Sequence, residues 1–341
     1  MQKLLLLTII SYLLMSCNPQ AGQNTNNKNT KNKDSRLTPP AKDQTKVNEE
    51  VANITKQLPL ETQEALIFLT HILNNDTIEP NISIYTDEEI NNFIIHLGPQ
   101  KIKDMVINIV LALKIIKNIE AKIQEINVNN LNKNVLIDEI RDEINKYKIA
   151  LKRAANQEFF DIAKINIQNT PITEIIDMQK KVKLAVDAQE KIIKKLEEYK
   201  HRPLNYLIKA ITNENTKKYD NYNKFNKFLL YIGVKKVSDM LINIKKHIIC
   251  AESAARKSGI IKDETQKTKL NNQLSKIHTD FKKSLREAFE HDDFDTIEQN
   301  INNVSYLDEF EKVETEAKRI FNSLLTSTPM KIDYDSVKID F

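Results

Sequence analysis

The sequence has few of the residues that interrupt helices or that build small disulfide-linked folds. Of its 341 residues, four are Gly, nine are Pro, two are Cys and none is Trp. Because Gly costs a helix ~1 kcal/mol relative to Ala, its scarcity favours helices. A charged fraction of 29% and a hydrophobic fraction of 40% agree with this. We therefore expect an all-α fold.

The two cysteines leave no disulfide to stabilise the mature fold. Cys17 has a different role, derived below, so Cys250 has no partner within the chain. Cys250 follows Ile248 and Ile249, and we expect it to be a small buried residue. The alternative is a free thiol that pairs between molecules. An exported chain without disulfides must be stabilised by its core packing alone.

No charge of one sign dominates the chain. The sequence has 51 basic and 47 acidic side chains, interleaved along its length, and a formal net charge of +4. A nucleic-acid-binding protein typically gathers its basic residues on one face, so this pattern argues against a nucleic-acid partner. It predicts a solvated surface of mixed charge.

Motifs for catalysis and metal binding are also missing from the sequence. The six histidines do not occur at metal-ligand spacings, and the sequence contains no glycine-rich phosphate loop and no nucleophile motif. The densest titratable cluster consists of Glu290, His291, Asp292 and Asp293. We interpret it as a surface turn; the alternative is a weak cation site. We expect no enzymatic activity, no metal site and no cofactor.

A short apolar run at the N-terminus ends at a cysteine. The run has the length of a secretory signal and is too short for a bilayer span, which needs ~20 apolar residues. The sequence Leu14-Met15-Ser16-Cys17 resembles the lipobox of bacterial lipoproteins. The resemblance implies that residues 1–16 are removed as a signal peptide and that acyl chains on Cys17 anchor the protein in a membrane. The alternatives are an ordinary signal peptide with a chance cysteine, and a buried N-terminal helix.

Polar segments flank the central part of the chain. Asn, Lys, Thr, Gln and Pro dominate the stretch after Cys17, which has too few large apolar residues to offset its ordering entropy. We predict that residues 17–55 hold the lipidated cysteine and a flexible tether. Residues 326–341 contain Pro329 and only isolated apolar residues, and we predict an irregular tail there.

The central part of the chain contains an internal repeat. Residues 90–109 match residues 225–244 at an offset of 135, and residues 151–169 match residues 285–303 at an offset of 134. Matches that return at almost the same offset indicate a tandem duplication. We call residues related by these offsets matched positions, and the predicted repeat units are 56–198 and 199–325.

The shared motif predicts a helical hairpin in each repeat unit. An apolar helix that carries Phe93 or Phe228 is expected to end at a glycine in the left-handed α conformation. A second, longer helix then follows, over 102–126 in the first repeat and 237–251 in the second. The dipole of a helix N-terminus would favour the shared aspartates. The motif residues are Phe93, Gly98, Asp104 and Met105, matched by Phe228, Gly233, Asp239 and Met240.

Other sequence signals place helix boundaries. Thr86, followed three positions later by Glu89, is typical of a capping box. Thr170 and Pro171 have the pattern of an N-cap and a proline at the first helical position. Pro203 marks the break between the repeat units. With about five helices expected in each repeat unit, we predict two tandem helical bundles.

The whole organisation resembles a known family. A lipobox that ends at Cys17, an Asn- and Lys-rich tether and tandem helical units with the Phe93–Met105 motif resemble the plasmid-encoded surface lipoproteins of Borrelia, particularly those of the relapsing-fever type. The resemblance implies an all-α fold, exposure on the outer membrane, and roles in host interaction or immune evasion.

These observations favour a membrane-anchored surface lipoprotein without enzymatic activity. Its expected partners are the membrane, through the lipid on Cys17, and host plasma or matrix proteins. The alternative is a structural or assembly lipoprotein of the cell envelope that faces the periplasm.

Overall fold

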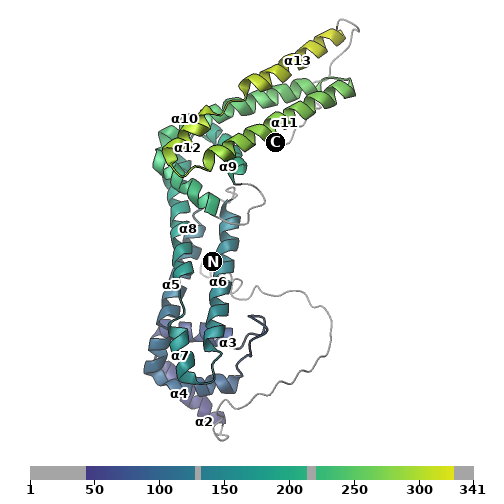
Figure 1. Cartoon of the computed structure of the whole chain (residues 1–341). Helices are drawn as coiled ribbons and strands as arrows, with labels where there is room; N and C mark the ends of the chain where they lie inside the picture. Colours follow the sequence, from purple (N-terminus) through teal and green to yellow (C-terminus); the bar gives the residue numbers. More distant parts are fainter. Residues whose placement is uncertain (1–43, 127–131, 213–219, 326–341) are drawn as a thin grey trace, which may run out of the picture. The chain divides into compact units, whose positions relative to one another are not determined.

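The computed structural model describes residues 44–126, 132–212 and 220–325, and every regular element in these ranges is a helix (Figure 1). The predicted all-α fold is confirmed. The α-helices are α2 (Gln44–Lys56), α3 (Leu60–Leu73), α4 (Asp87–Met105), α5 (Ile107–Ile123), α6 (Asn132–Ala155), α7 (Phe160–Gln168), α8 (Thr173–Lys191), α9 (His201–Ile211), α10 (Asp220–Gly259), α11 (Glu264–Phe289), α12 (Phe294–Asn303) and α13 (Leu307–Leu325), with short 3-10 helices η1 (Ile193–Lys195) and η2 (Glu198–Lys200).

The chain divides into two compact units. Of the described residues, the first unit takes those up to Ile116 together with Asp142–Ile176, and the second takes Lys117–Arg141 and those from Asp177 onwards. The boundary lies within α5, within α6 and near the start of α8. These compact units differ from the repeat units predicted from sequence similarity, 56–198 and 199–325, whose boundaries stay a prediction.

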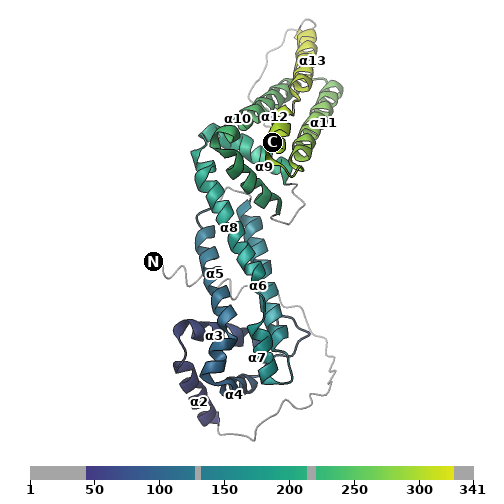
Figure 2. The same cartoon turned by 60° about the vertical axis from the view of Figure 1, so that its left-hand side comes forward.

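The first unit is built around α3, α4 and α7. Its interior is aliphatic and aromatic: Leu69, Ile72 and Phe93 are at most 2% exposed. Figure 2 shows α4 next to α7, and the two helices are in contact. Tyr85 enters this core before α4 and donates a 2.6 Å hydrogen bond from its hydroxyl to the carbonyl oxygen of Ala155. This one hydrogen bond gives a partner both to the buried hydroxyl and to a carbonyl group at the C-terminus of α6.

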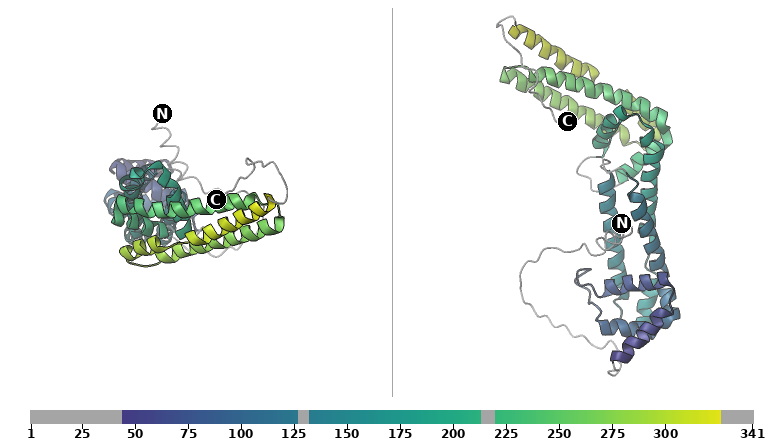
Figure 3. Two further views of the ribbon diagram at one scale, coloured as in Figure 1. Left: turned by 90° about the horizontal axis from the view of Figure 1, so that it is seen from above. Right: turned by 180° about the vertical axis from the view of Figure 1, so that it is seen from behind.

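The second unit contains the longest helix described. α10 packs along α11 and α13, which the right-hand view of Figure 3 shows as neighbouring green and yellow helices. At one end of these helices, Leu270 and Ile277 of α11 lie in an aliphatic cluster with residues of α10 and α13. The helical spacing of apolar residues on α10, α11 and α13 produces this seam. The buried members of the cluster are Ala254, Ile261, Leu270, Val313, Ala317 and Ile320.

Each repeat glycine interrupts a helix, as predicted: α4 and α10 each consist of two helical segments that meet at a kink, at Gly98 and at Gly233. Gly98 has φ 65° and ψ 175°, and Gly233 has φ 75° and ψ 168°. The predicted left-handed α conformation is wrong, because ψ lies in the extended range that only glycine combines with a positive φ. Pro99 contributes at Gly98, since a residue before proline is driven to extended ψ. The predicted second helix is broken again at Val106 in the first unit, whereas α10 continues to Gly259.

The predicted tether is too long at its C-terminal end. Residues 44–56 form α2, which contacts α4, and Asn91 on α4 donates a hydrogen bond to the side chain of Asn48. Val47 and Ile54 are buried because their spacing places them on one face of the helix. Three apolar residues among polar ones were enough for a packed helix. The rest of the predicted tether, and the predicted tail over 326–341, lie outside the described residues.

The predicted capping box is confirmed, whereas the predicted start of α8 is wrong. The Thr86 hydroxyl accepts a 3.2 Å hydrogen bond from the Glu89 amide, and the Glu89 carboxylate accepts a 2.8 Å bond from the Thr86 amide. At the other site, α8 begins at Thr173. Thr170 instead donates its hydroxyl to the carbonyl oxygen of Asn166, which satisfies the C-terminus of α7. Pro203 lies in the first turn of α9.

Candidate binding surfaces

The motif of the first repeat forms a corner where α4 meets α7. The buried ring of Phe93 packs edge-to-face on Phe160, with ring centroids 5.2 Å apart. Above the rings, the Asp161 carboxylate accepts hydrogen bonds from Lys101 Nζ at 3.0 Å and pairs with His96 Nε2 at 3.1 Å. These hydrogen bonds, from Lys101 first and His96 second, lower the pKa of Asp161. The aromatic pair fixes the corner, and the polar cluster lies exposed on its surface.

The same contacts occur where α10 meets α12. Phe228 packs edge-to-face on Phe294 with centroids 6.0 Å apart. The Asp295 carboxylate accepts a 2.9 Å hydrogen bond from the Tyr231 hydroxyl and lies 3.8 Å from Lys236 Nζ. Tyr231 is the matched position of His96, so a tyrosine replaces the histidine. Lys236 bonds more closely to Glu298, at 2.6 Å, and Lys164 occupies the matched position of Glu298 in the first unit.

In each unit, two side chains donate hydrogen bonds to backbone carbonyl groups, and the donors and acceptors of the two units lie at matched positions. Asn108 donates to Gln168 O at 2.7 Å, and Asn243 donates to Asn302 O at 3.0 Å. Lys152 Nζ donates to Asn75 O at 2.6 Å, and Arg286 Nε donates to Ala210 O at 3.1 Å. All eight residues are related by the offsets of 134 or 135. The duplication stays a prediction, and these paired contacts are what support it.

The other motif residues, the two methionines and the two aspartates, do not take part in these corners. Met105 and Met240 are buried in the cores of their units, and Asp104 and Asp239 are exposed. The expected stabilisation of these carboxylates by a helix N-terminus is wrong. Asp104 lies in the last turn of α4, where its Oδ1 accepts a hydrogen bond from Gln100, and Asp239 lies well beyond the Gly233 kink inside α10. The helix dipole acts only within about the first turn.

Exposed aliphatic side chains gather next to the first corner. The bond between Asn108 and Gln168 ties the start of α5 to the end of α7. Exposed aliphatic residues lie next to these two residues, or within two helical turns of them, on both helices. We call them the α5–α7 apolar surface; its members are Ile107 (59% exposed), Leu111 (46%), Ile162 (46%) and Ile165 (52%).

The second corner does not repeat this apolar surface. At the matched positions the chain has Ile242, Lys246, Thr296 and Gln299, so only Ile242 is aliphatic. Ile242 is also less exposed, at 37%. Two corners with the same internal contacts therefore present different outer surfaces. Core packing does not require the aliphatic residues of the α5–α7 surface, because the second corner is built without them.

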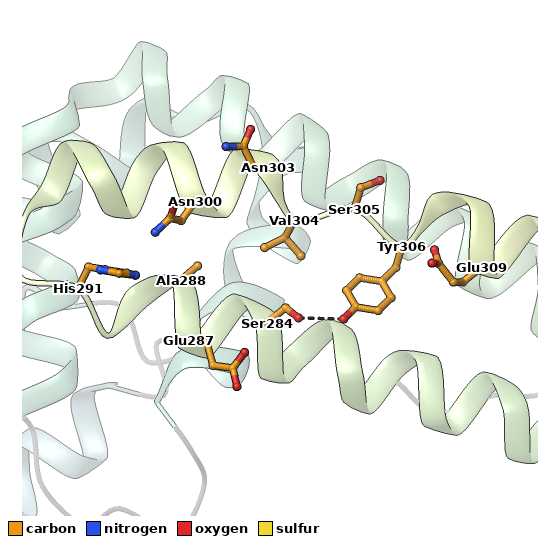
Figure 4. A pocket seen from close by; sticks show the side chains of 10 residues that line it. All are labelled: Ser284, Glu287, Ala288, His291, Asn300, Asn303, Val304, Ser305, Tyr306 and Glu309. Carbon is orange, nitrogen blue, oxygen red and sulfur yellow. Dashed lines mark hydrogen bonds between the residues drawn. The ribbon is translucent and has the colours of Figure 1, made fainter.

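A polar groove lies between α11, α12 and the start of α13 (Figure 4). It has a volume of about 540 Å³. The Ser284 hydroxyl and the Tyr306 hydroxyl are hydrogen bonded at 2.9 Å across one side, and the carboxylates of Glu287 and Glu309 lie apart from each other in Figure 4. The groove has no convergent set of catalytic groups among its lining residues. We regard it as a solvated depression between helices.

The acidic cluster next to this groove forms a turn. Glu290, His291 and Asp292 are exposed between α11 and α12, and Asp293 is the N-cap of α12. The Asp293 carboxylate accepts hydrogen bonds from the hydroxyl and the amide of Thr296, which lower its pKa. Within residues 44–126, 132–212 and 220–325, no group of three or more His, Cys, Asp or Glu side chains is placed to hold a metal ion.

Cys250 is partly exposed, so the expectation of a small buried residue is wrong. Its neighbours Ile248 and Ala251 occupy the core-facing side of α10, and Cys250 lies on the flank of that side. Burial raises the pKa of the thiol, and the carboxylates of Glu311 and Glu314 raise it further. The thiol is therefore protonated at neutral pH and reacts slowly.

Two imidazoles are packed among aromatic rings in the second unit. His247 donates from Nδ1 to the Asn243 carbonyl at 2.9 Å and accepts at Nε2 from the Tyr306 amide at 3.1 Å, which fixes a neutral ring. Burial lowers the pKa of His247. Burial, followed by the positive charge of Lys282, lowers the pKa of His278 to about 4.

The neutral imidazoles predict that the second unit is sensitive to acid. An unfolded histidine takes up a proton below pH ~6.5, while the folded form resists it, so stability is complete above that pH and is lost as pH falls toward the folded pKa. Between pH 7 and 5 we expect a loss of about 1–2 kcal/mol of unfolding free energy. Urea unfolding at several pH values checks this, and the variant His278→Phe should show a smaller slope. An equal slope in the variant would contradict the assignment to His278.

The lipobox residues Leu14, Met15, Ser16 and Cys17 lie outside the described residues. In the part of the chain that the structure describes, no helix combines the length and the apolar character needed to cross a bilayer. The α5–α7 apolar surface was not expected from the sequence. Its signal was present, since Ile162 and Ile165 are aliphatic where the matched positions are polar.

Comparisons with known proteins give one distant structural likeness. No family model matches the chain, and no curated protein matches it. A solved structure, "Crystal structure of a putative surface protein encoded by BTA121", aligns over 81% of this chain and 94% of its own, at 15% sequence identity and a TM-score of 0.31. A likeness at this level does not establish a shared function.

Proposed function

We propose that the protein is a lipid-anchored surface lipoprotein of the outer membrane that binds a host plasma or matrix protein and has no enzymatic activity. The α5–α7 apolar surface carries this proposal. Its apolar side chains are exposed on two helices of one unit that the hydrogen bond between Asn108 and Gln168 joins, and exposed apolar groups of this kind are typical of protein–protein interaction sites. Polar residues replace three of the four at the matched positions, so the surface is specific to the first unit.

The N-terminal sequence supports the location in this proposal. The lipobox that ends at Cys17 implies acylation of the new N-terminus, and two or more acyl chains make a stable membrane anchor. The described residues of the first unit begin at Gln44 of α2, and 26 residues, 18–43, lie between Cys17 and Gln44 in the sequence. Those residues connect the anchor to the unit that carries the apolar surface.

The matched positions of the second corner supply the substitutions that test the α5–α7 apolar surface. The triple variant Leu111→Lys, Ile162→Thr and Ile165→Gln replaces three of its aliphatic residues with the polar residues found at those matched positions. Because all three side chains are about half exposed, we expect the fold to be kept and the free energy of unfolding to change by less than ~1 kcal/mol. Binding to the host partner should fall at least tenfold.

The binding experiment uses the purified chain as bait against host plasma and solubilised extracellular matrix. Bound proteins are identified and their affinities measured with the original chain and with the triple variant. A control variant, Ile242→Thr, changes the aliphatic residue of the second corner and should leave binding unchanged. Equal capture by the triple variant, or no partner at micromolar affinity, would contradict the proposal.

A further inference from the structure

A second cavity lies inside the second unit, between α9, α10, α11 and α13. Its volume is about 210 Å³. It is separate from the polar groove of Figure 4, and none of its lining residues belongs to the α5–α7 apolar surface. We call it the aryl pocket; its lining residues on α9 are Arg202, Asn205, Tyr206 and Lys209.

The inner wall of the aryl pocket is made of flat rings. Tyr206 stacks on Phe281 with centroids 5.7 Å apart, and Phe281 stacks on His247 with centroids 4.6 Å apart. His278 meets the edge of Tyr206 at 5.4 Å, with 73° between the ring planes. Phe310 closes the wall from α13 and is 1% exposed. Phe281 and His247 are buried beneath these contacts, at 2% and 1% exposed, whereas Tyr206 and His278 are partly exposed. The partly exposed rings offer an aromatic surface to which another planar ring can pack.

The mouth of the aryl pocket is positively charged. Arg202, Lys209 and Lys282 line it, and no Asp or Glu does. Arg202 pairs with Glu252, which lies outside the lining. Lys282 lies over the Tyr206 ring, 5.6 Å from its centroid. Among the described residues, no carboxylate lies within ion-pair distance of Lys209 or Lys282, so both ammonium groups can bind an anion.

The two imidazoles of the pocket are neutral, so its positive charge comes from the lysine and arginine side chains. Both nitrogens of His247 have partners, and His278 Nδ1 lies 3.4 Å from the Tyr206 hydroxyl. Burial keeps the two rings neutral at physiological pH. The pocket therefore combines a neutral aromatic wall with a cationic rim. A neutral apolar ligand would leave the rim unused, and an inorganic anion would leave the wall unused.

We propose that the aryl pocket binds an aromatic ring that carries an anionic substituent, such as a sulfate, phosphate or carboxylate. The ring packs against the partly exposed rings of Tyr206 and His278, and the anion meets Lys282 and Lys209 at the rim. The same chemistry has two sources: a free aryl acid, and a modified tyrosine side chain of another protein. The pocket does not depend on the α5–α7 surface or on the location of the protein.

The test titrates the purified protein with phenyl sulfate at neutral pH, followed by calorimetry and by the ring-proton resonances of His247 and His278. We expect one binding site, with shifts at both rings. Benzyl alcohol, which lacks the charge, and inorganic sulfate, which lacks the ring, should each bind at least tenfold more weakly. No shift at millimolar phenyl sulfate would overturn the proposal, as would equal affinity for either control ligand.

Variants decide whether the rim lysines bind the anion. Lys282→Met keeps the stem over Tyr206 and removes the charge, and it should weaken phenyl sulfate binding at least tenfold. Lys283→Met, at the next position and exposed, should bind as the original chain does. Lys209→Gln provides a second test at an exposed position if Lys282→Met does not fold. Unchanged affinity in Lys282→Met, or in Lys209→Gln where that variant replaces it, would overturn the proposal.

A peptide with a sulfated tyrosine separates the two sources. If the peptide binds the pocket at least tenfold more tightly than phenyl sulfate, the ligand is a modified side chain of a partner protein. If the peptide binds no more tightly, the ligand is a free aryl acid. Both results keep the pocket chemistry, and binding of the peptide that survives Lys282→Met would contradict it.

Discussion

Replacing Cys17 with Ala is expected to move the protein from the membrane to the soluble fraction and to leave its helical units folded. Each buried methylene of an acyl chain contributes about 0.8 kcal/mol, so two or more chains hold the protein firmly and their loss releases it. Partition between detergent and aqueous phases measures the release, and circular dichroism measures the helicity.

The second cysteine provides the control for this experiment. Cys250→Ala removes a partly exposed thiol from α10 and should leave the protein in the detergent phase. Metabolic labelling with a fatty acid should mark the original chain and Cys250→Ala, and should not mark Cys17→Ala. If Cys17→Ala stays in the membrane, the lipobox assignment is wrong. If it loses helicity, the N-terminal segment belongs to the fold.

Replacing Lys152 with Met is expected to cause a large loss of stability in the first unit. Lys152 is 1% exposed, and its ammonium group donates to Asn75 O at 2.6 Å and to Ile78 O at 2.5 Å. Burial lowers the pKa of Lys152, while Asp76 and Glu79 oppose this. Met has a similar length and no donor, so two carbonyl groups lose their partner. We expect a loss of about 2–4 kcal/mol in unfolding free energy.

Arg286, at the matched position of Lys152 in the second unit, should lose less stability when it is replaced with Met. Among the described residues, Arg286 has one hydrogen-bond partner, Ala210 O, and it is partly buried, so Arg286→Met should cost about 1–2 kcal/mol. Urea unfolding of both variants measures the difference. The rate of amide hydrogen exchange in Lys152→Met should rise first at residues 74–85, because Lys152 is hydrogen bonded to two carbonyl groups of this segment. Equal stability of Lys152→Met and the original chain would contradict the role assigned to its ammonium group.

Periodic apolar residues and helix caps made much of the fold predictable. The helical spacing of apolar residues over 237–251 and the capping box at Thr86 are local patterns, and local patterns specify helices well. The conformation of Gly98 was not predictable in the same way, because the sequence shows that glycine is present but not which positive-φ region it adopts. α2 was missed since three apolar residues gain stability only against a partner helix, and the partner is distant in the sequence.

Predicting the candidate sites from the sequence was harder, because they depend on contacts between distant segments. Exposure of Ile162 and Ile165 follows from how α7 packs on α4, and in the sequence only the comparison with the polar residues at the matched positions indicates it. Likewise, Lys152 belongs to a helix whose neighbouring lysines are solvated, and only the fold places it against the carbonyl groups of residues 75 and 78. The aryl pocket requires four helices, so its lysines look like ordinary surface residues in the sequence.

The most direct test of the proposed function is brief protease treatment of intact cells that express the original chain. A lipoprotein displayed on the outer surface should be cleaved within minutes, while a periplasmic marker protein in the same cells stays intact. Cells permeabilised before treatment should lose both proteins. If the chain survives in intact cells and is cleaved only after permeabilisation, it faces the periplasm, and the proposed display on the cell surface is wrong.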